Sequence, residues 1–253
     1  MKKFLFYMLL CVATFGLSSC EKGGLNLSKT SYTLYSDDST KIEGSDLDNV
    51  VWDSQNEFVA TAEGNILTSI LVGFTTLSCG DATISVTVKP RHTLYTEPYM
   101  KWGCSKSDII AKFGTPDSET DTALGYATDN SAAPLVMYMF NSDKLTSCAV
   151  AVKMSYASEL VDFIAERYVI LEVDGTAATF VHCYGKVSDP KFDYGGQMDY
   201  SSSLGGFIVA YIPNSNETSS SNISLDLEGT RGVEKTSTFN DLEKAIIDSN
   251  ILK

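Results

Sequence analysis

The side chains that could act as a catalytic base are few, because the chain holds only two histidines, His92 and His182. A serine or cysteine nucleophile needs such a base within hydrogen-bonding distance. Neither histidine lies in a nucleophile motif, and the sequence contains no Gly-x-Ser-x-Gly elbow, phosphate-binding loop or zinc-protease helix. The sequence therefore predicts a protein that is not an enzyme and uses no cofactor.

Paired carboxylates leave one catalytic alternative open. Glycoside hydrolases use two Asp or Glu side chains that can be distant in the chain, and 32 acidic residues are available here. The C-terminal part is small for most enzymes of that class. A small hydrolase is therefore the least favoured of the functional hypotheses.

His182 and Cys183 are adjacent residues that could ligate a metal. Neighbours on a strand point to opposite faces, so one ion does not easily reach both, and we expect no metal site. Cys183 is expected in the core beside Val181. Phe180, His182 and Tyr184 share the other face, either as a second core layer or as a partly exposed aromatic surface.

The segment 184–206 interleaves aromatic residues with glycine and aspartate. Loops rich in Tyr, Gly and Ser make adaptable contacts with ligands, and the alternative is a long hairpin with a solvated tip. Its aspartates lack the regular spacing of a calcium loop. The candidate ligand-binding residues are Tyr184, Phe192, Tyr194 and Tyr200.

The first twenty residues carry the clearest motif. Two lysines precede an apolar run over 4–16 that is too short to be a permanent membrane span. Leu17-Ser18-Ser19-Cys20 follows and resembles the lipobox of bacterial lipoproteins. The resemblance implies that 1–19 is a signal peptide, that Cys20 is acylated, and that 20–24 tether the exported chain to the outer membrane, facing either the cell surface or the periplasm.

Charge and cysteine content fit an exported protein. Removal of residues 1–19 takes away two lysines and no acid, which changes the formal net charge from -13 to -15. Such an acidic chain is a poor partner for nucleic acid, so the expected partners are the membrane, through its lipid, and a protein or glycan ligand. Four cysteines, Cys79, Cys104, Cys148 and Cys183, allow three disulfide pairings or none.

Residues 25–89 alternate apolar and polar positions in short runs separated by turn residues, which indicates half-buried strands. The stretch resembles the bacterial Ig-like group 2 family in its 25–31 start, in Val51-Trp52-Asp53-Ser54, in Gly73-Phe74-Thr75-Thr76 and in Ile84-Ser85-Val86. Pairing within 36–48 is less defined than in that family. The resemblance implies a β-sandwich with Trp52 in its core, used as a spacer or adhesive unit.

A linker at 90–99, between Pro90 and Pro98, separates this module from the domain at 100–253. Ser105 and Asp108 predict the N-terminal cap of a helix that ends before Gly114. Strands are expected at 123–128, 135–140 and 144–153. This helix and the strands after it resemble the β-lactamase-inhibitor-like fold of small envelope lipoproteins.

A second helix is expected at 156–168, with Leu160, Val161, Ile164 and Ala165 on one face, followed by strands at 169–173, 176–184 and 206–212. These elements suggest a diverged internal repeat. A surface loop at 214–222, a strand at 223–227 and an amphipathic helix at 238–250 complete the chain. The apolar residues of that helix, which is expected to pack on the sheet, are Phe239, Leu242, Ile246 and Ile247.

Two triplets, Asp38-Ser39-Thr40 and Asp121-Thr122-Ala123, resemble the O-glycosylation acceptor motif of some Gram-negative bacteria. Ser39 and Thr122 are thus candidate acceptors in predicted turns.

The predicted fold has two domains: an all-β Ig-like sandwich, then an α+β domain of short helices packed on an antiparallel sheet. The favoured function is a membrane-anchored envelope lipoprotein that displays a non-catalytic binding domain for adhesion or ligand capture. An envelope-assembly scaffold is the alternative.

Overall fold

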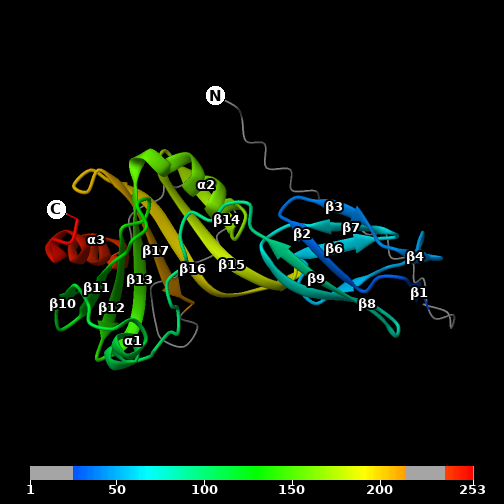
Figure 1. Cartoon of the computed structure of the whole chain (residues 1–253), viewed down its shortest axis with the longest axis horizontal. Helices are drawn as coiled ribbons and strands as arrows, with labels where there is room; N and C mark the ends of the chain where they lie inside the picture. Colours follow the sequence, from blue (N-terminus) through cyan, green and yellow to red (C-terminus); the bar gives the residue numbers. More distant parts are fainter. Residues whose placement is uncertain (1–24, 215–236, 253) are drawn as a thin grey trace.

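The computed structural model describes residues 25–214 and 237–252, which form a predominantly β structure with several antiparallel sheets (Figure 1). The predicted signal peptide, Cys20, most of the surface loop and the strand at 223–227 lie outside the described residues. No helix within the described part of the chain is long and apolar enough to cross a membrane.

The N-terminal region, residues 25–89, contains three small sheets. Most strand pairs are antiparallel, but β2 and β9 run parallel. The four-stranded sheet has the order β2 (Ser31–Tyr35), β9 (Ala82–Lys89), β8 (Gly73–Cys79) and β5 (Asp53–Ser54). The three-stranded sheet has the order β3 (Ser39–Lys41), β7 (Ile66–Ser69) and β6 (Ala60–Glu63). The two-stranded sheet pairs β1 (Asn26–Leu27) with β4 (Gly44–Ser45).

Alternating residues of these strands meet in one core. Ile84, Val86 and Val88 of β9 are buried, as their period of two predicts. Trp52 is 7% exposed and belongs to this core, which confirms the expectation for its side chain. Its indole Nε1 donates a hydrogen bond of 2.9 Å to the Gly64 carbonyl oxygen, so the one polar group of the ring is satisfied.

The C-terminal region is built on one eight-stranded antiparallel sheet. Its first half contains β10 (Ser118–Glu119), β11 (Ala123–Ala127), β12 (Leu135–Asn141) and β13 (Lys144–Lys153). Its second half contains β17 (Gly206–Pro213), β16 (Asp189–Ser201), β15 (Ala177–Lys186) and β14 (Val169–Asp174). Strands β13 and β17, the last of each half, pair at the centre. Each half is therefore one helix followed by four strands.

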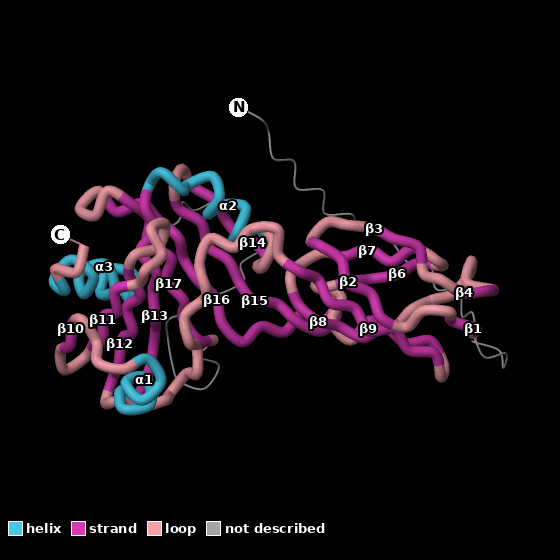
Figure 2. Tube along the Cα trace, in the orientation of Figure 1, coloured by secondary structure: helices cyan, strands magenta, loops and turns pink. Residues whose placement is uncertain are grey.

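Helices cover both faces of this sheet (Figure 2). Helix α1 (Lys106–Phe113) begins at the predicted capping box, in which Ser105 and Asp108 bond to each other's backbone N–H groups. It shares one face with α2 (Ala157–Ala165), which follows a short 3₁₀ turn (Met154–Tyr156). Helix α3 (Ser237–Ser249) packs on the sheet, as predicted, and covers the face opposite α1 and α2.

Two details of the helix predictions are wrong. Val161 and Ala165 were expected on the buried face of α2, but both side chains are exposed, Val161 by 46%, and Phe163 is buried with Leu160 and Ile164 instead. Ile247 lies at the rim of α3 rather than under it. In both helices the buried stripe is narrower than the run of apolar residues, because one sheet face covers only part of a helix surface.

Polar contacts fix the N-terminal region, together with the start of the segment that follows it, to the end of α2. Glu166 is buried, and its carboxylate accepts hydrogen bonds from the backbone N–H groups of Arg91 (2.8 Å) and His92 (3.0 Å). It also pairs with the Arg167 guanidinium at 2.5 Å. The Glu166 carbonyl oxygen accepts a 2.7 Å bond from the Val72 N–H group. We call this set of contacts the Glu166 junction.

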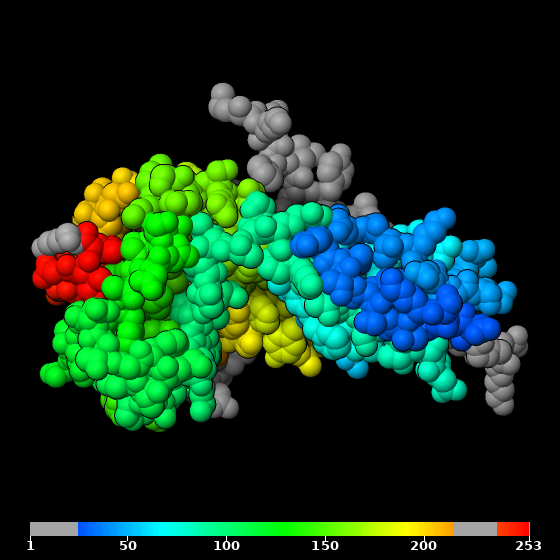
Figure 3. Space-filling model, viewed as in Figure 1, coloured from blue at the N-terminus to red at the C-terminus, as the bar shows by residue number. Residues whose placement is uncertain are grey.

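A second junction lies at the tip of the β15–β16 hairpin, whose yellow surface lies against the cyan N-terminal region in Figure 3. The Glu57 N–H group donates to the Gly185 carbonyl oxygen at 2.8 Å, and the Val187 N–H group donates to the Glu57 carboxylate at 2.9 Å. The Lys186 ammonium group contacts both Asp53 and Glu57. We call this set of contacts the hairpin junction.

Gly196 of β16 lies directly under the Phe180 ring. A Cβ atom added there would lie 2.3 Å from Phe180 Cζ and 2.5 Å from the Ala210 carbonyl oxygen. We expect Gly196→Ala to lower the free energy of unfolding by about 1–3 kcal/mol, because the buried ring and strand must shift. Urea unfolding measures this. The double variant with Phe180→Leu should show a favourable coupling energy, and additive effects would contradict the steric explanation.

Candidate functional site

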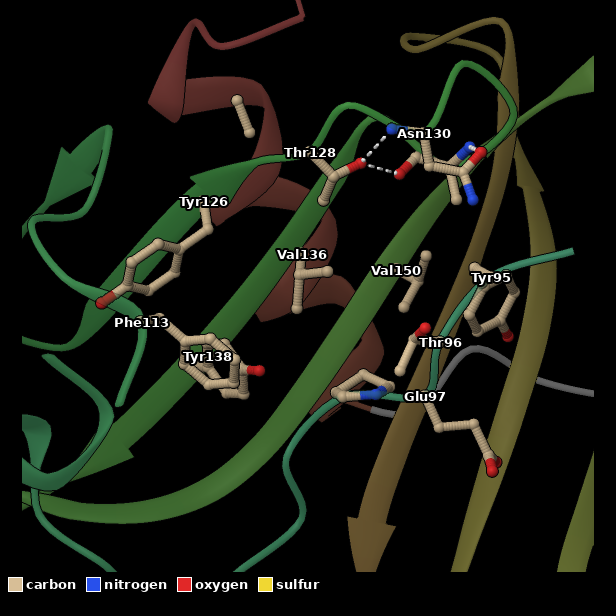
Figure 4. A pocket seen from close by; sticks show the side chains of 13 residues that line it. Tyr95, Thr96, Glu97, Phe113, Tyr126, Thr128, Asn130, Val136, Tyr138 and Val150 are labelled. Carbon is tan, nitrogen blue, oxygen red and sulfur yellow. Dashed lines mark hydrogen bonds between the residues drawn. The ribbon is translucent and has the colours of Figure 1, made fainter. Parts of the chain in front are cut away.

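A pocket of about 340 Å³ lies on the α1 face of the sheet, above β11, β12 and β13 (Figure 4). This volume falls at the lower end of the range of small-molecule sites, roughly 300–1,000 Å³. The side chains that define its character are Tyr95, Glu97, Phe113, Tyr126, Val136, Tyr138 and Val150.

The segment 94–99 forms one wall of the pocket. Asn130 Nδ2 donates a 2.7 Å bond to the Leu94 carbonyl oxygen, and the Tyr95 and Tyr211 hydroxyl groups lie 2.7 Å apart. The Tyr99 N–H group donates to the Tyr138 hydroxyl at 3.2 Å. The sequence predicted a linker here, and the segment indeed lacks helix and strand. It crosses the sheet as a packed structure, however, because Leu94 and Tyr95 are buried in the core.

Three aromatic rings form the opposite wall. Phe113 stacks near Tyr138 with ring centres 5.9 Å apart, and Tyr126 lies 5.8 Å from Phe113 and 6.1 Å from Tyr138. The Tyr126 hydroxyl donates to the Gly114 carbonyl oxygen at 3.1 Å. Burial raises the pKa of Tyr138, so its phenol stays neutral at physiological pH. This wall therefore presents uncharged ring faces.

Glu97 is the one charged side chain among the described residues that line the pocket. Its Oε1 atom is buried and has no hydrogen-bond partner. Burial raises the pKa of Glu97, while Arg167 and His182 act in the opposite direction. Such an oxygen is costly to leave unpaired. In Figure 4 the Glu97 side chain points away from Tyr126 and Tyr138, so its carboxyl group lies beside the pocket rather than on the accessible wall.

The predicted ligand-binding residues do not form one surface. Tyr194 stacks on His182, with ring centres 4.9 Å apart and planes 6° apart. Tyr200 packs on Phe207, about 20 Å along the strand from Tyr194 at 3.3 Å per residue. Phe192 pairs with Cys183 whereas Tyr194 pairs with His182, so the two rings lie on opposite faces of the sheet. Tyr184 is 40% exposed.

The segment that carries these residues is the hairpin alternative rather than a loop, because β16 pairs with both β15 and β17. Phe180 is buried, which makes its face of β15 a core layer near the sheet centre. His182 Nδ1 lies 2.8 Å from Asp193 Oδ1 at the more exposed end of that face.

The chain matches no family model, no curated protein and no solved structure.

The remaining predictions concern the cysteines, a possible metal site and the two candidate O-glycosylation residues. The thiols of Cys104, Cys148 and Cys183 are free and buried, and burial raises the pKa of Cys183 to about 11. Within residues 25–214 and 237–252, no three His, Cys, Asp or Glu side chains gather as a metal site would require. Ser39 and Thr122 are both exposed. The predicted turn is wrong for Ser39, which begins β3 and pairs with Thr68 of β7, whereas Thr122 lies just before β11.

Sequence reasoning missed the pocket itself. Tyr95 and Glu97 lay in a segment interpreted as a linker, and Tyr126 and Tyr138 were assigned to strands without a role. The available signal was the apolar content of 94–98, where Leu94, Tyr95 and Pro98 are unusual for a solvated connection.

Proposed function

We propose that this chain is an exported, lipid-anchored envelope protein that captures a small ligand without changing it chemically. The pocket above β11–β13 is the observation that carries the proposal. It combines ring faces with aliphatic side chains, and its described lining includes no histidine or cysteine; the carboxyl group of Glu97 points away from the rings (Figure 4). Such a lining suits binding, because catalysis by acid and base groups needs at least two reactive side chains in contact with the substrate.

The N-terminal region supports the same proposal as a spacer. Its sheets close around a core of their own, which includes Trp52 and Leu77, and the sequence of this region resembles bacterial Ig-like modules. We infer that residues 25–89 are an Ig-like domain that holds the pocket away from the lipid on Cys20.

An envelope-assembly scaffold is the second candidate. The two halves of the large sheet, each a helix followed by four strands, favour it, because this is the pattern expected from the resemblance to small envelope lipoproteins. Co-purification of the protein with membrane complexes would support this candidate over ligand capture.

Anchoring is tested by replacing the lipobox cysteine. We expect Cys20→Ala to abolish incorporation of labelled palmitate and to leave an uncleaved or mislocalised precursor, because acylation of that thiol precedes cleavage. Cys11→Ala, in the predicted apolar run of the signal peptide, is the matched control and should be labelled like the wild type. Labelled mature protein from the Cys20→Ala gene would overturn the proposed anchor.

Ligand capture is tested with the purified protein. After incubation with an extract of the host envelope and growth medium, mass spectrometry of the separated protein should find a small molecule enriched and unchanged in mass. Val136→Trp places a large ring in the middle of the pocket (Figure 4) and should prevent this enrichment. Equal enrichment by Val136→Trp, or recovery of a converted product alone, would contradict the proposal.

A further inference from the structure

The described lining of the pocket offers no accessible counter-charge to a charged ligand. Neither lysine nor arginine is among the described residues that line it, and the Glu97 carboxyl group points away from Tyr126 and Tyr138 (Figure 4). Arg167 and His182 act electrostatically on that carboxyl group instead. A charged ligand would therefore lose hydration on entering the pocket without meeting an opposite charge, which is costly.

Charge outside the lining does not remove this cost. The Lys112 ammonium group lies 4.5 Å from the centre of the Tyr99 ring and 5.6 Å from that of the Phe113 ring, within the distance at which ring faces attract a cation. A cationic ligand at the same rings would be repelled by Lys112, and an anionic ligand would be repelled by a chain with a formal net charge of -13. Each sign of charge therefore meets one attraction and one repulsion.

Three polar side chains of the pocket are engaged within the protein. The Thr128 hydroxyl donates to the Ala133 carbonyl oxygen at 2.6 Å, and Asn130 Nδ2 donates to the Leu94 carbonyl oxygen at 2.7 Å. The Tyr126 hydroxyl donates to the backbone just after α1. A ligand that competed for these groups would break existing hydrogen bonds, so apolar contact offers the larger gain in binding.

The aromatic wall, formed by Phe113, Tyr126 and Tyr138, has the geometry to accept a further ring. The planes of Phe113 and Tyr138 differ by 23°, whereas the plane of Tyr126 stands at 79° to that of Tyr138. Phe113 is 45% exposed, so part of the wall is in contact with solvent. A flat ring in this corner can stack on one ring and meet the edge of another, and aromatic pairs prefer these two arrangements.

Val136 and Val150 form an aliphatic floor between the aromatic wall and Tyr95 (Figure 4). We propose that the ligand of this pocket is an uncharged aromatic compound, which packs on this floor and against the aromatic wall. The inference rests on the proposed ligand capture and specifies the class of ligand. Charged molecules with the same ring system, and saturated molecules of the same size, bind more weakly.

Three naphthalene compounds with the substituent at the same ring carbon provide the direct test: naphthalenemethanol is neutral, naphthoate is an anion and naphthylmethylammonium is a cation. The mature chain is produced without acyl groups, which would themselves bind the probes. In isothermal titration calorimetry we expect the neutral compound to bind at least about tenfold more tightly than either ion. Because the chain is acidic overall, its net charge would favour the cation instead. Equal or tighter binding of either ion, or no binding of the neutral compound, would overturn the inference.

The saturated analogue, decahydronaphthalenemethanol, tests whether the pocket recognises a ring. It should bind several-fold more weakly than naphthalenemethanol, because it lacks aromatic faces. Tyr126→Leu removes one ring of the wall and should reduce this preference. Tyr35→Leu removes a ring that is 48% exposed on β2 of the N-terminal region, so it is the matched control and should leave the preference unchanged. Equal binding of the two compounds to the wild type would contradict recognition of an aromatic ring.

The outcomes separate this inference from the proposed function. If the protein enriches a charged or purely aliphatic molecule that Val136→Trp no longer captures, ligand capture stands and the inference of an uncharged aromatic ligand falls. If Val136→Trp binds naphthalenemethanol as tightly as the wild type does, the compound binds elsewhere and its assignment to this pocket is wrong.

Discussion

Glu166→Gln is expected to lower the free energy of unfolding by about 3–5 kcal/mol, because it breaks a buried ion pair by removing one charge. The side chains of Glu166 and Arg167 are 6% and 10% exposed, so water cannot replace the lost partner. The amide of glutamine keeps one acceptor oxygen, so its NH2 group would also face one of the two N–H groups, of Arg91 or of His92, that need an acceptor. The variant thus removes the centre of the Glu166 junction.

Urea unfolding followed by circular dichroism measures this effect. Glu159→Gln, an exposed position on the same helix, is the matched control and should change the unfolding free energy by less than about 0.5 kcal/mol. A double-mutant cycle with Arg167→Met should give a coupling energy between the two side chains. A loss below about 1 kcal/mol in Glu166→Gln would show that the junction is not a main source of stability.

Trp52→Ala is expected to cost about 3–5 kcal/mol of unfolding free energy, because it removes a large side chain from the core of the N-terminal region. The Gly64 carbonyl oxygen also loses its buried donor, the indole Nε1. Trp102→Ala is the matched control, since Trp102 is half-buried beside Tyr194 and should cost clearly less. An equal cost for the two tryptophans would contradict the assignment of Trp52 to the centre of that core.

Local patterns in the sequence predicted most of the individual elements. The alternation of Ile84, Val86 and Val88 indicates a half-buried strand whatever its partners are, and the Ser105 and Asp108 capping box sets the start of α1 from four consecutive residues. Both signals depend on neighbours in the chain alone. Both can therefore be recognised in the sequence without knowledge of the tertiary structure.

The candidate site could not be predicted in this way, because it depends on pairing between distant segments. The Tyr99 N–H group reaches the Tyr138 hydroxyl only after 94–99 crosses the sheet, and nothing local in either segment specifies that path. The irregularity between His182 and Cys183 shifts the register of β15 against β16. It decides which face Tyr194 and Phe192 occupy, so simple alternation along 184–206 gave no reliable guide to a shared surface.

The spacing of the two junctions has a mechanical consequence. A body joined to another at one point can swivel about three axes, whereas two separate attachments leave rotation only about the line between them. Glu166 lies three residues before β14, whose first residue, Val169, pairs with Val181 of β15. Gly185 of the hairpin junction lies four residues beyond Val181, roughly 13 Å further along β15 at 3.3 Å per residue. The Glu166 and hairpin junctions thus restrict rotation between the N-terminal region and the large sheet. A force applied at residue 25 would therefore turn the pocket together with the N-terminal strands.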